Sequence, residues 1–232
     1  MKTEKEKMLA GEVFNVYDPE LVKERQYARQ LVERFNALGE MNPTASNTVI
    51  RQLFGHVGEK CEVHSQFKCD YGYNIYVDDD FFANYDCVML DVSPIRIGKH
   101  CLLGPRVQIY TVNHPLDLRL RRNGAYGQSK DVTIGDDAWI GGGAIICPGV
   151  TLGNNVIVGA GSVVTKSVPS GMVVGGNPAK IICSIDEFYE RNKKYDIHSK
   201  NFSSIEKEKF LRSMSEDKFI KRSYLSDVRN EH

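Results

Sequence analysis

Residues 132–167 fall into six consecutive blocks of six residues, VTIGDD, AWIGGG, AIICPG, VTLGNN, VIVGAG and SVVTKS. The first residue of each block is small or β-branched, and the third is a branched aliphatic residue: Ile134, Ile140, Ile146, Leu152, Val158 and Val164. Apolar residues two positions apart are typical of a short β-strand, whereas a helix repeats every 3.6 residues. Each block therefore predicts one short strand followed by a corner.

The same period extends toward the N-terminus. The blocks IRIGKH and CLLGPR begin at Ile95 and Cys101, and weaker copies place Val77, Ala83 and Met89 in the aliphatic position. Glycine follows the aliphatic residue at positions 98, 104, 135, 141, 153 and 159. We expect glycine there to permit the unusual backbone angles of a sharp corner.

One turn of such strands cannot bury its own apolar face, so successive turns must stack into a continuous core. The sequence therefore predicts a mainly β protein built on a parallel β-helix. A β-sandwich would show longer strands with irregular spacing.

Other segments flank or interrupt the repeat. A helix is predicted over residues 18–38, with Asp18 as its N-cap and Gly39 at its end. A second, short helix is predicted from Pro43 to Phe54. Residues 111–131 are polar and non-periodic, so we expect them to protrude from the coil as a loop.

The chain is thus divided into an N-terminal helical segment (1–60), a coil (61–183) and a charged helical extension (184–232). In the extension, Ser203 and Glu206 form a capping box, with Phe202 as a hydrophobic staple. One apolar face is predicted to contain Phe210, Leu211, Met214, Phe219, Ile220 and Tyr224. Charges of both signs along this tail favour a solvated helix packed on the coil or on a neighbouring subunit over a membrane-binding or partner-binding helix.

Composition restricts the function classes. The 30 basic and 30 acidic residues give a formal net charge of zero, which argues against nucleic-acid and membrane-surface partners. The N-terminus has no apolar run of a signal peptide, so we expect a cytoplasmic protein. The six cysteines show neither CxxC pairs nor metal-ligand spacing, which predicts free thiols and no metal site.

His114 opens the protruding loop, and a histidine is suited to general-base catalysis near neutral pH. A single histidine is weak evidence, but Asn84 and Asp91 lie about one coil turn earlier in the chain. Stacking brings such positions close to the base of the loop. The sequence therefore predicts a polar site where the loop leaves the coil.

Several stretches resemble the maltose and galactoside O-acetyltransferase family: KMLAGEVF, DPEL, CDYGYNIYV, FFANYDCVMLDV, YTVNHPLD, VIVGAGSVVTK and GGNPAK. The resemblance covers about residues 5–185. It implies a left-handed coil with three strands per turn, a homotrimer with sites between subunits, and acetyl-CoA as co-substrate. The hand comes from the resemblance alone, because the usual crossover rule gives the opposite one.

The resemblance also implies roles for individual residues. His114 is the general base that takes the proton of an acceptor hydroxyl as that hydroxyl attacks the thioester, and Asn84 assists it. The residues implied for acceptor binding are Arg25, Asp70, Asn84 and Asp91. The residues implied for contact with coenzyme A are Trp139, Gly142, Ala160, Thr165, Lys166 and Lys180, with a backbone N–H near Gly142 meeting the developing oxyanion.

Two departures from the family leave the acceptor open. Asn15 and Val16 stand where relatives often carry an acceptor-contacting aspartate, and Lys180 and Cys183 stand where some relatives carry arginines. The alternative to a sugar is another small acceptor, such as an amino sugar, an antibiotic or serine. A metal-dependent carbonic anhydrase on the same coil would need three histidine ligands, and a non-catalytic scaffold would not need His114.

Overall fold

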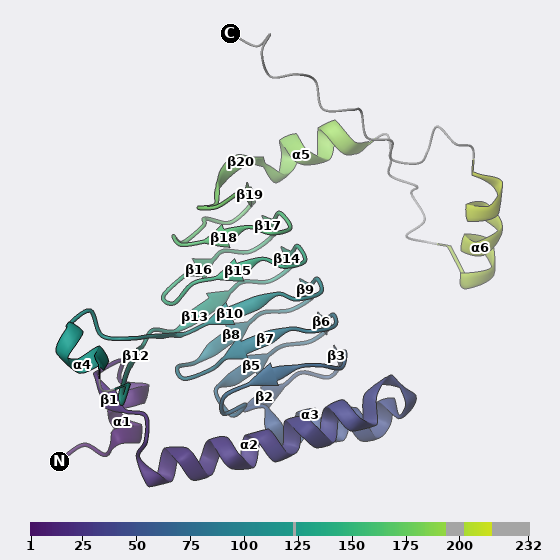
Figure 1. Cartoon of the computed structure of the whole chain (residues 1–232). Helices are drawn as coiled ribbons and strands as arrows, with labels where there is room; N and C mark the ends of the chain where they lie inside the picture. The colour runs from purple at the N-terminus through teal and green to yellow at the C-terminus, as the bar shows by residue number, and fades with distance from the viewer. Residues whose placement is uncertain (123, 194–201, 215–232) are drawn as a thin grey trace, which may run out of the picture. The chain divides into compact units, whose positions relative to one another are not determined.

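The structure is a computed structural model that describes residues 1–122, 124–193 and 202–214. The chain divides into two compact units, Met1–Ile185 and Asp186–His232. The first unit is a stack of short strands with helices at one end and a looped-out segment at one side (Figure 1). The parallel coil predicted from the six-residue period is confirmed.

Three sheets form the faces of the coil, and the chain visits them in a fixed order. The first face contains β2 (His56–Val57), β5 (Ile75–Val77), β8 (Ile95–Ile97), β13 (Val132–Ile134) and β16 (Thr151–Leu152). The second face contains β3 (Cys61–Val63), β6 (Phe81–Ala83), β9 (Leu102–Leu103), β14 (Trp139–Ile140), β17 (Ile157–Val158), β19 (Met172–Gly175) and β20 (Lys180–Ser184). The third face contains β4 (Lys68–Cys69), β7 (Val88–Leu90), β10 (Gln108–Tyr110), β15 (Ile145–Ile146) and β18 (Val163–Val164).

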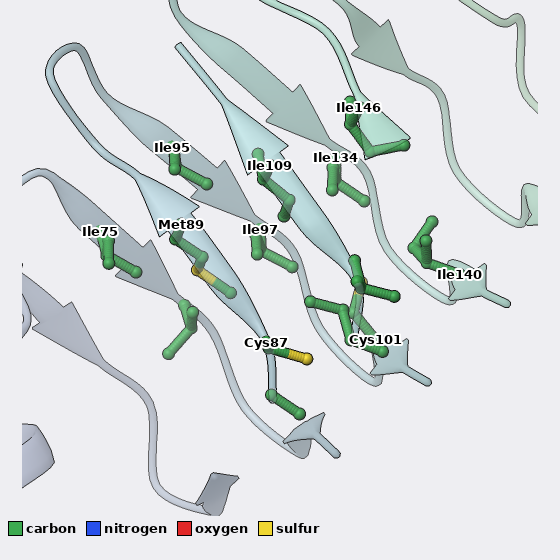
Figure 2. Packing of buried hydrophobic residues seen from close by; sticks show 14 of the residues in the cluster. Ile75, Cys87, Met89, Ile95, Ile97, Cys101, Ile109, Ile134, Ile140 and Ile146 are labelled. Atoms are coloured by element: carbon green, nitrogen blue, oxygen red, sulfur yellow. The ribbon is translucent and has the colours of Figure 1, made fainter. Parts of the chain in front are cut away.

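The aliphatic residues of successive strands stack inside this coil. Ile75 pairs with Ile95 on the first face, and Met89 pairs with Ile109 on the third. Their side chains point into the interior, as Figure 2 shows, and all four are fully buried. Stacking of each turn on the next therefore supplies the apolar burial that one turn lacks.

The cysteines of the coil serve packing. Cys87 and Cys101 are fully buried and face the interior (Figure 2). Burial raises the pKa of each thiol to about 11, so neither is a thiolate near neutral pH. All six cysteines are free thiols, as the sequence predicts.

The prediction that the six repeated glycines adopt the unusual backbone angles of a sharp corner is wrong. None of the six has a positive φ. A Cβ at five of them would instead lie within 3.0 Å of atoms of the next turn; at Gly141 it would lie 2.5 Å from the Ala160 nitrogen. The left-handed conformation falls two residues later in each block, at His100, Arg106, Asp137, Gly143, Asn155 and Gly161. Glycine is required because adjacent turns approach too closely for a side chain.

Two helices cover the first turn of the coil. α2 (Pro19–Leu38) begins after the N-cap Asp18 and ends at Gly39, as predicted. A short 3-10 helix η1 (Gly39–Met41) leads into α3 (Pro43–Leu53), whose N-cap is Asn42. Most buried apolar residues of the two helices join the same core as the strands: Ala28, Leu31, Val32 and Phe35 of α2, and Val49, Ile50 and Leu53 of α3. Leu21 of α2 packs instead in a second cluster with Met8 and Phe14.

The segment 111–131 leaves the coil but is more ordered than expected. It contains β11 (Val112–Asn113), α4 (Leu118–Arg122) and β12 (Tyr126–Ser129), and β11 and β12 pair in an antiparallel hairpin. β12 also pairs with β1 (Phe14–Asn15), which follows α1 (Glu4–Leu9). Neither α1 nor β1 was predicted, although Thr3 and Glu6 form the capping box that signals α1.

β19 and β20 close the other end of the coil as an antiparallel pair. α5 (Ile185–Asn192) begins at the last residue of the first unit, and α6 (Ser204–Ser213) lies in the second. The predicted capping box of Ser203 and Glu206 is confirmed, and the ring of Phe202 packs on Phe210. The predicted apolar residues Phe219, Ile220 and Tyr224 lie outside the described residues. Within the described parts of the chain, no helix is long and apolar enough to cross a membrane.

Substituting Gly153 tests the close-approach explanation. Its Cβ would lie 2.5 Å from the Ser170 backbone nitrogen, so we expect Gly153→Ala to lower the free energy of unfolding by roughly 1–3 kcal/mol. The matched control is Gly161→Asn, at a position with φ of 70° and no atom within 4 Å of a Cβ. Asparagine tolerates this conformation, so the control should cost about 1 kcal/mol or less. Urea unfolding of the three proteins measures both effects, and equal losses would contradict the explanation.

Candidate active site

Two corners of the coil carry most of the predicted site residues. The histidine edge follows the third-face strands and carries Asp70, Asp91, Thr165 and Lys166, and the loop with His114 leaves from it. The asparagine edge follows the second-face strands and carries Asn84, Gly142 and Ala160. The third face lies between the two edges, so they are separate parts of the surface of one chain.

The loop orients the His114 imidazole. His114 is exposed, and its Nδ1 lies 3.2 Å from the carbonyl oxygen of Tyr126 in the facing strand β12. A carbonyl only accepts hydrogen bonds, so Nδ1 carries the proton of the neutral ring. Nε2 is then left as an unprotonated nitrogen that can accept a proton from a bound hydroxyl.

Buried polar contacts fix the base of this loop. The Thr111 hydroxyl donates to the Leu90 carbonyl at 2.7 Å and accepts from the Ser93 amide at 2.9 Å. On the other strand of the hairpin, where Ser129 pairs with Val112, the Ser129 hydroxyl donates to the Met8 carbonyl at 2.7 Å. The three hydroxyl-bearing side chains are buried, so the loop is held to both the coil and the N-terminal segment.

Arg25 and Asp70 come together beside the histidine edge. Arg25 donates to the Tyr71 hydroxyl at 2.6 Å and to the Val16 carbonyl at 2.5 Å. Burial raises the pKa of Asp70, and the guanidinium groups of Arg25 and Arg29 partly oppose that rise. Tyr71 was missed by the sequence reasoning, although it lies within the DYGYN motif that the resemblance singled out. Arg25, Asp70 and Tyr71 form what we call the acceptor cluster.

Asp91 lies beneath this cluster rather than on its surface. Its side chain is fully buried, and one carboxylate oxygen accepts from the backbone amides of Asp70 at 3.0 Å and Tyr71 at 2.9 Å. The other oxygen faces the Asn74 amide at 3.3 Å. Burial outweighs these hydrogen bonds and raises the pKa of Asp91 to about 7. Asp91 therefore holds the turn that carries Asp70, and its direct contact with an acceptor stays a prediction.

The asparagine edge presents hydrogen-bond donors. Asn84 Oδ1 accepts from the Tyr85 amide at 2.8 Å, which leaves the side-chain NH₂ group available. The backbone amides of Gly142 and Ala160, on adjacent turns, donate to no other described residue. Trp139 points outward on the second face and is 49% exposed, as predicted. This edge therefore offers a row of N–H donors next to an aromatic ring.

The structure thus brings the predicted residues together in two groups. Thr165 and Lys166 are exposed on the histidine edge, the same side as His114. The loop and α4 project from one side of the coil, opposite the side where β6, β9 and β14 turn (Figure 1). Lys180 is exposed in β20 and pairs with Gly175, which follows the Val174 that pairs with Val158, so Lys180 lies near Ala160 at the end of the asparagine edge. Among the described residues, no group of three His, Cys, Asp or Glu side chains is placed to hold a metal ion.

Comparison with known proteins identifies two family models. The maltose acetyltransferase hexapeptide capping motif matches residues 7–58, which contain α2 and α3. The bacterial transferase hexapeptide model of six repeats matches residues 131–166, which contain the blocks quoted at the outset except for the last residue, Ser167. The two models together cover α2, α3 and the regular end of the coil.

Relatives match over about four-fifths of the chain. Nodulation protein L of Rhizobium meliloti is 45% identical over 78% of this chain and 98% of its own length. A solved structure of a maltose O-acetyltransferase from Clostridium difficile is 50% identical, covers 79% of this chain and 97% of its own, and has a TM-score of 0.77. A galactoside acetyltransferase in complex with coenzyme A is 32% identical, with coverages of 82% and 94% and a TM-score of 0.78.

The buried Asp91 predicts a specific pH dependence of stability. Its folded-state pKa of about 7 lies above the ordinary value of 3.8, so the folded chain keeps this proton to a higher pH than the unfolded chain. The contribution of Asp91 to stability is therefore largest near pH 4 and is lost as pH rises toward 7. Asp91→Asn, which cannot ionise, should lack this loss. Thermal unfolding of both proteins from pH 5 to pH 8 measures it, and parallel curves would refute the assignment.

Proposed function

The chain belongs to the maltose and galactoside O-acetyltransferase family, and we propose that it transfers the acetyl group of acetyl-CoA to a hydroxyl of a small sugar. The observation that carries this proposal is the imidazole of His114, whose Nδ1 faces a carbonyl and whose Nε2 has no hydrogen-bond partner among the described residues. The hydrogen-bond donors of the asparagine edge supply the second requirement of acyl transfer, which is stabilisation of a developing negative charge. The cytoplasmic location expected from the sequence stays a prediction.

His114 acts first on the acceptor. Its Nε2 accepts the proton of the sugar hydroxyl while that oxygen attacks the thioester carbonyl carbon. The Tyr126 carbonyl holds the Nδ1 proton throughout and stabilises the imidazolium that forms. The same Nε2 then returns its proton to the departing sulfur, so the histidine ends the cycle neutral.

The asparagine edge acts on the thioester. The free N–H groups of Gly142 and Ala160 are the donors on this edge for the thioester oxygen and for the amide carbonyls of the pantetheine arm. The Trp139 ring lies on the adjoining face as an apolar wall for that arm. Lys166, exposed on the histidine edge, and Lys180 supply positive charge for the phosphates.

A complete site requires two copies of the chain. His114 and the acceptor cluster belong to one edge and Asn84, Gly142 and Trp139 to the other side of the third face, so one coil cannot close them around a single substrate. A homotrimer, in which the histidine edge of each copy faces the asparagine edge of the next, brings the two groups together three times. The outward residues Ile145 and Val163 of the third face are partly exposed in one chain and available to that interface.

Replacing the histidine tests the general-base role. We expect His114→Ala to lower kcat by about 10²–10⁴-fold with a sugar acceptor, because a positioned base supplies that much. His100→Ala is the matched control, since His100 is an exposed histidine of the coil that faces Asp137 at another corner. Release of the coenzyme A thiol measures the rate for a panel of sugars and amines. A loss below about tenfold for His114→Ala would contradict the role.

Mixing two inactive variants tests the shared site. Subunits carrying His114→Ala keep an intact asparagine edge, and subunits carrying Asn84→Ala keep an intact histidine. Random assembly should restore about a quarter of the wild-type activity if each site takes one edge from each of two copies. Co-expressed and separately purified variants are compared by thiol release. If both single variants are inactive and the mixed assembly is equally inactive, the two groups act within one chain.

A further inference from the structure

Three strands outside the coil form a small sheet in the order β1–β12–β11, and β12 is its central strand. Figure 1 shows α1, β1 and β12 together at one side of the coil. β11 leads into His114 and pairs Val112 with Ser129 of β12. On the other side of β12, β1 pairs Asn15 with Tyr126. The carbonyl that faces the His114 imidazole therefore belongs to a strand held from both sides.

The edge strand β1 determines the direction of that carbonyl. The Val16 amide, directly after β1, donates to the Ala125 carbonyl at 2.7 Å. Successive carbonyls of an extended strand point to opposite sides, so the Tyr126 carbonyl points away from β1. It lies 3.2 Å from the Nδ1 atom of His114. A hydrogen bond weakens steeply as its angle changes, so a rotation of β12 would release the imidazole.

Side-chain packing joins β1 to the acceptor cluster. The ring of Phe14 is buried and lies against Gly127, where a Cβ would come within 2.9 Å of the ring atom Cζ. Tyr71 of the acceptor cluster belongs to the same apolar cluster as Phe14. The Arg25 guanidinium donates to the Val16 carbonyl at 2.5 Å. The same short segment thus contacts both the acceptor cluster and β12.

Glu4 of α1 holds the outer edge of β1. Lys7 donates to Glu4 Oε1 at 2.6 Å, and the Asn15 amide donates to Glu4 Oε2 at 2.5 Å. The hydrogen bonds from Lys7 and Asn15 lower the pKa of the Glu4 carboxyl, so the group is a carboxylate near neutral pH. Hydrogen bonds to a charged acceptor are among the stronger ones in proteins. Glu4 therefore anchors an edge strand of only two residues, which has β12 alone as its strand partner among the described residues.

We propose that Glu4 is a positioning residue for acetyl transfer, which holds β1 against β12 and so keeps the Tyr126 carbonyl aligned with His114. Its hydrogen bonds are to Lys7 and Asn15, so it acts on the imidazole only through the two strands. A shift of about 1 Å at a catalytic group can lower a rate by about 10²-fold. This inference rests on the proposed acetyltransferase function and on His114 as its general base.

Removing the Glu4 carboxylate tests the positioning role. We expect Glu4→Ala to lower kcat about tenfold for the sugar that the wild-type protein acetylates fastest, with KM for acetyl-CoA changed less than about twofold, because the asparagine edge is untouched. Glu4→Gln keeps an oxygen that accepts from the Asn15 amide and should retain most of kcat. Glu6→Ala is the matched control: Glu6 is an exposed acid of the same helix that accepts from the Thr3 amide, and kcat should stay within about twofold. Release of the coenzyme A thiol measures all four proteins.

Asn15→Pro removes the other partner of the same hydrogen bond. Proline lacks the amide N–H, and it is tolerated in an edge strand where that N–H does not face the sheet. This second variant should lower kcat as Glu4→Ala does.

The possible results separate the two proposals. If Glu4→Ala and Asn15→Pro both keep kcat within about twofold of the wild type, the positioning role is refuted. Equal losses in Glu4→Ala and Glu4→Gln, or in Glu4→Ala and Glu6→Ala, also refute it, because the loss then does not follow the hydrogen bond to Asn15. If only His114→Ala loses activity in the same assay, the proposed function stands without the role of Glu4. If the wild-type protein transfers acetyl groups to no sugar, the proposed function fails and the positioning role fails with it.

Discussion

The distance between neighbouring turns of the coil is the constraint on which the rest of the structure depends. Parallel ladders hold the turns at the ordinary strand spacing of about 4.8 Å. At that spacing there is no room for a Cβ where a strand enters its corner: a Cβ at Gly141 would lie only 2.5 Å from the Ala160 nitrogen. The absence of a side chain at these positions therefore allows the ladders to form. Each turn of the coil is stabilised only by the turns next to it.

The same ladders tolerate a long insertion at a corner. Thr133 pairs with Thr151, 18 positions later, but Val132 pairs with Ile95, 37 positions earlier, and the register of both pairs is regular. Pairing joins whole strands across turns, so extra chain can leave at one corner without displacing the next strand. β1 and α1, more than 100 positions away in sequence, hold the inserted segment. The candidate base His114 lies on this insertion.

The periodic part of the sequence predicted the fold because burial alternates with a fixed period. Residues such as Ile134 and Ile140 could be assigned to the interior by counting alone, and Asp18 and Gly39 marked the ends of α2 by their capping chemistry. The pairing of β1 with β12 was not predictable, since a two-residue strand and a four-residue strand far apart in sequence show no period. The burial of Asp91 could not be predicted from the sequence either, because a corner residue of a coil can face either inward or outward.

The spacing of residues along the sequence was also not enough to predict the geometry of the candidate site. His114 could be found from its position at the start of the loop, but the hydrogen bond that fixes its tautomer is to a backbone carbonyl, and any residue at position 126 would supply one. The free amides of Gly142 and Ala160 likewise depend on backbone geometry rather than on side-chain type. The contact of Arg25 with Tyr71 joins residues 46 positions apart. These features depend on segments that only the folded chain brings together, so the local sequence pattern does not reveal them.

A filled coil also restricts where chemistry can take place. Its interior is packed with aliphatic side chains and excludes polar ligands, so reactive groups must lie on its faces and corners. A corner of such a coil is convex, and a convex surface cannot surround a substrate or exclude water from it. A second surface is needed to make a cleft, and the protruding loop supplies only one wall. The separation of His114 from Asn84 on two edges is therefore what a coil must show if its catalytic cleft is to form between copies. In the proposed homotrimer each copy presents one wall at each of these edges, and two copies complete each cleft.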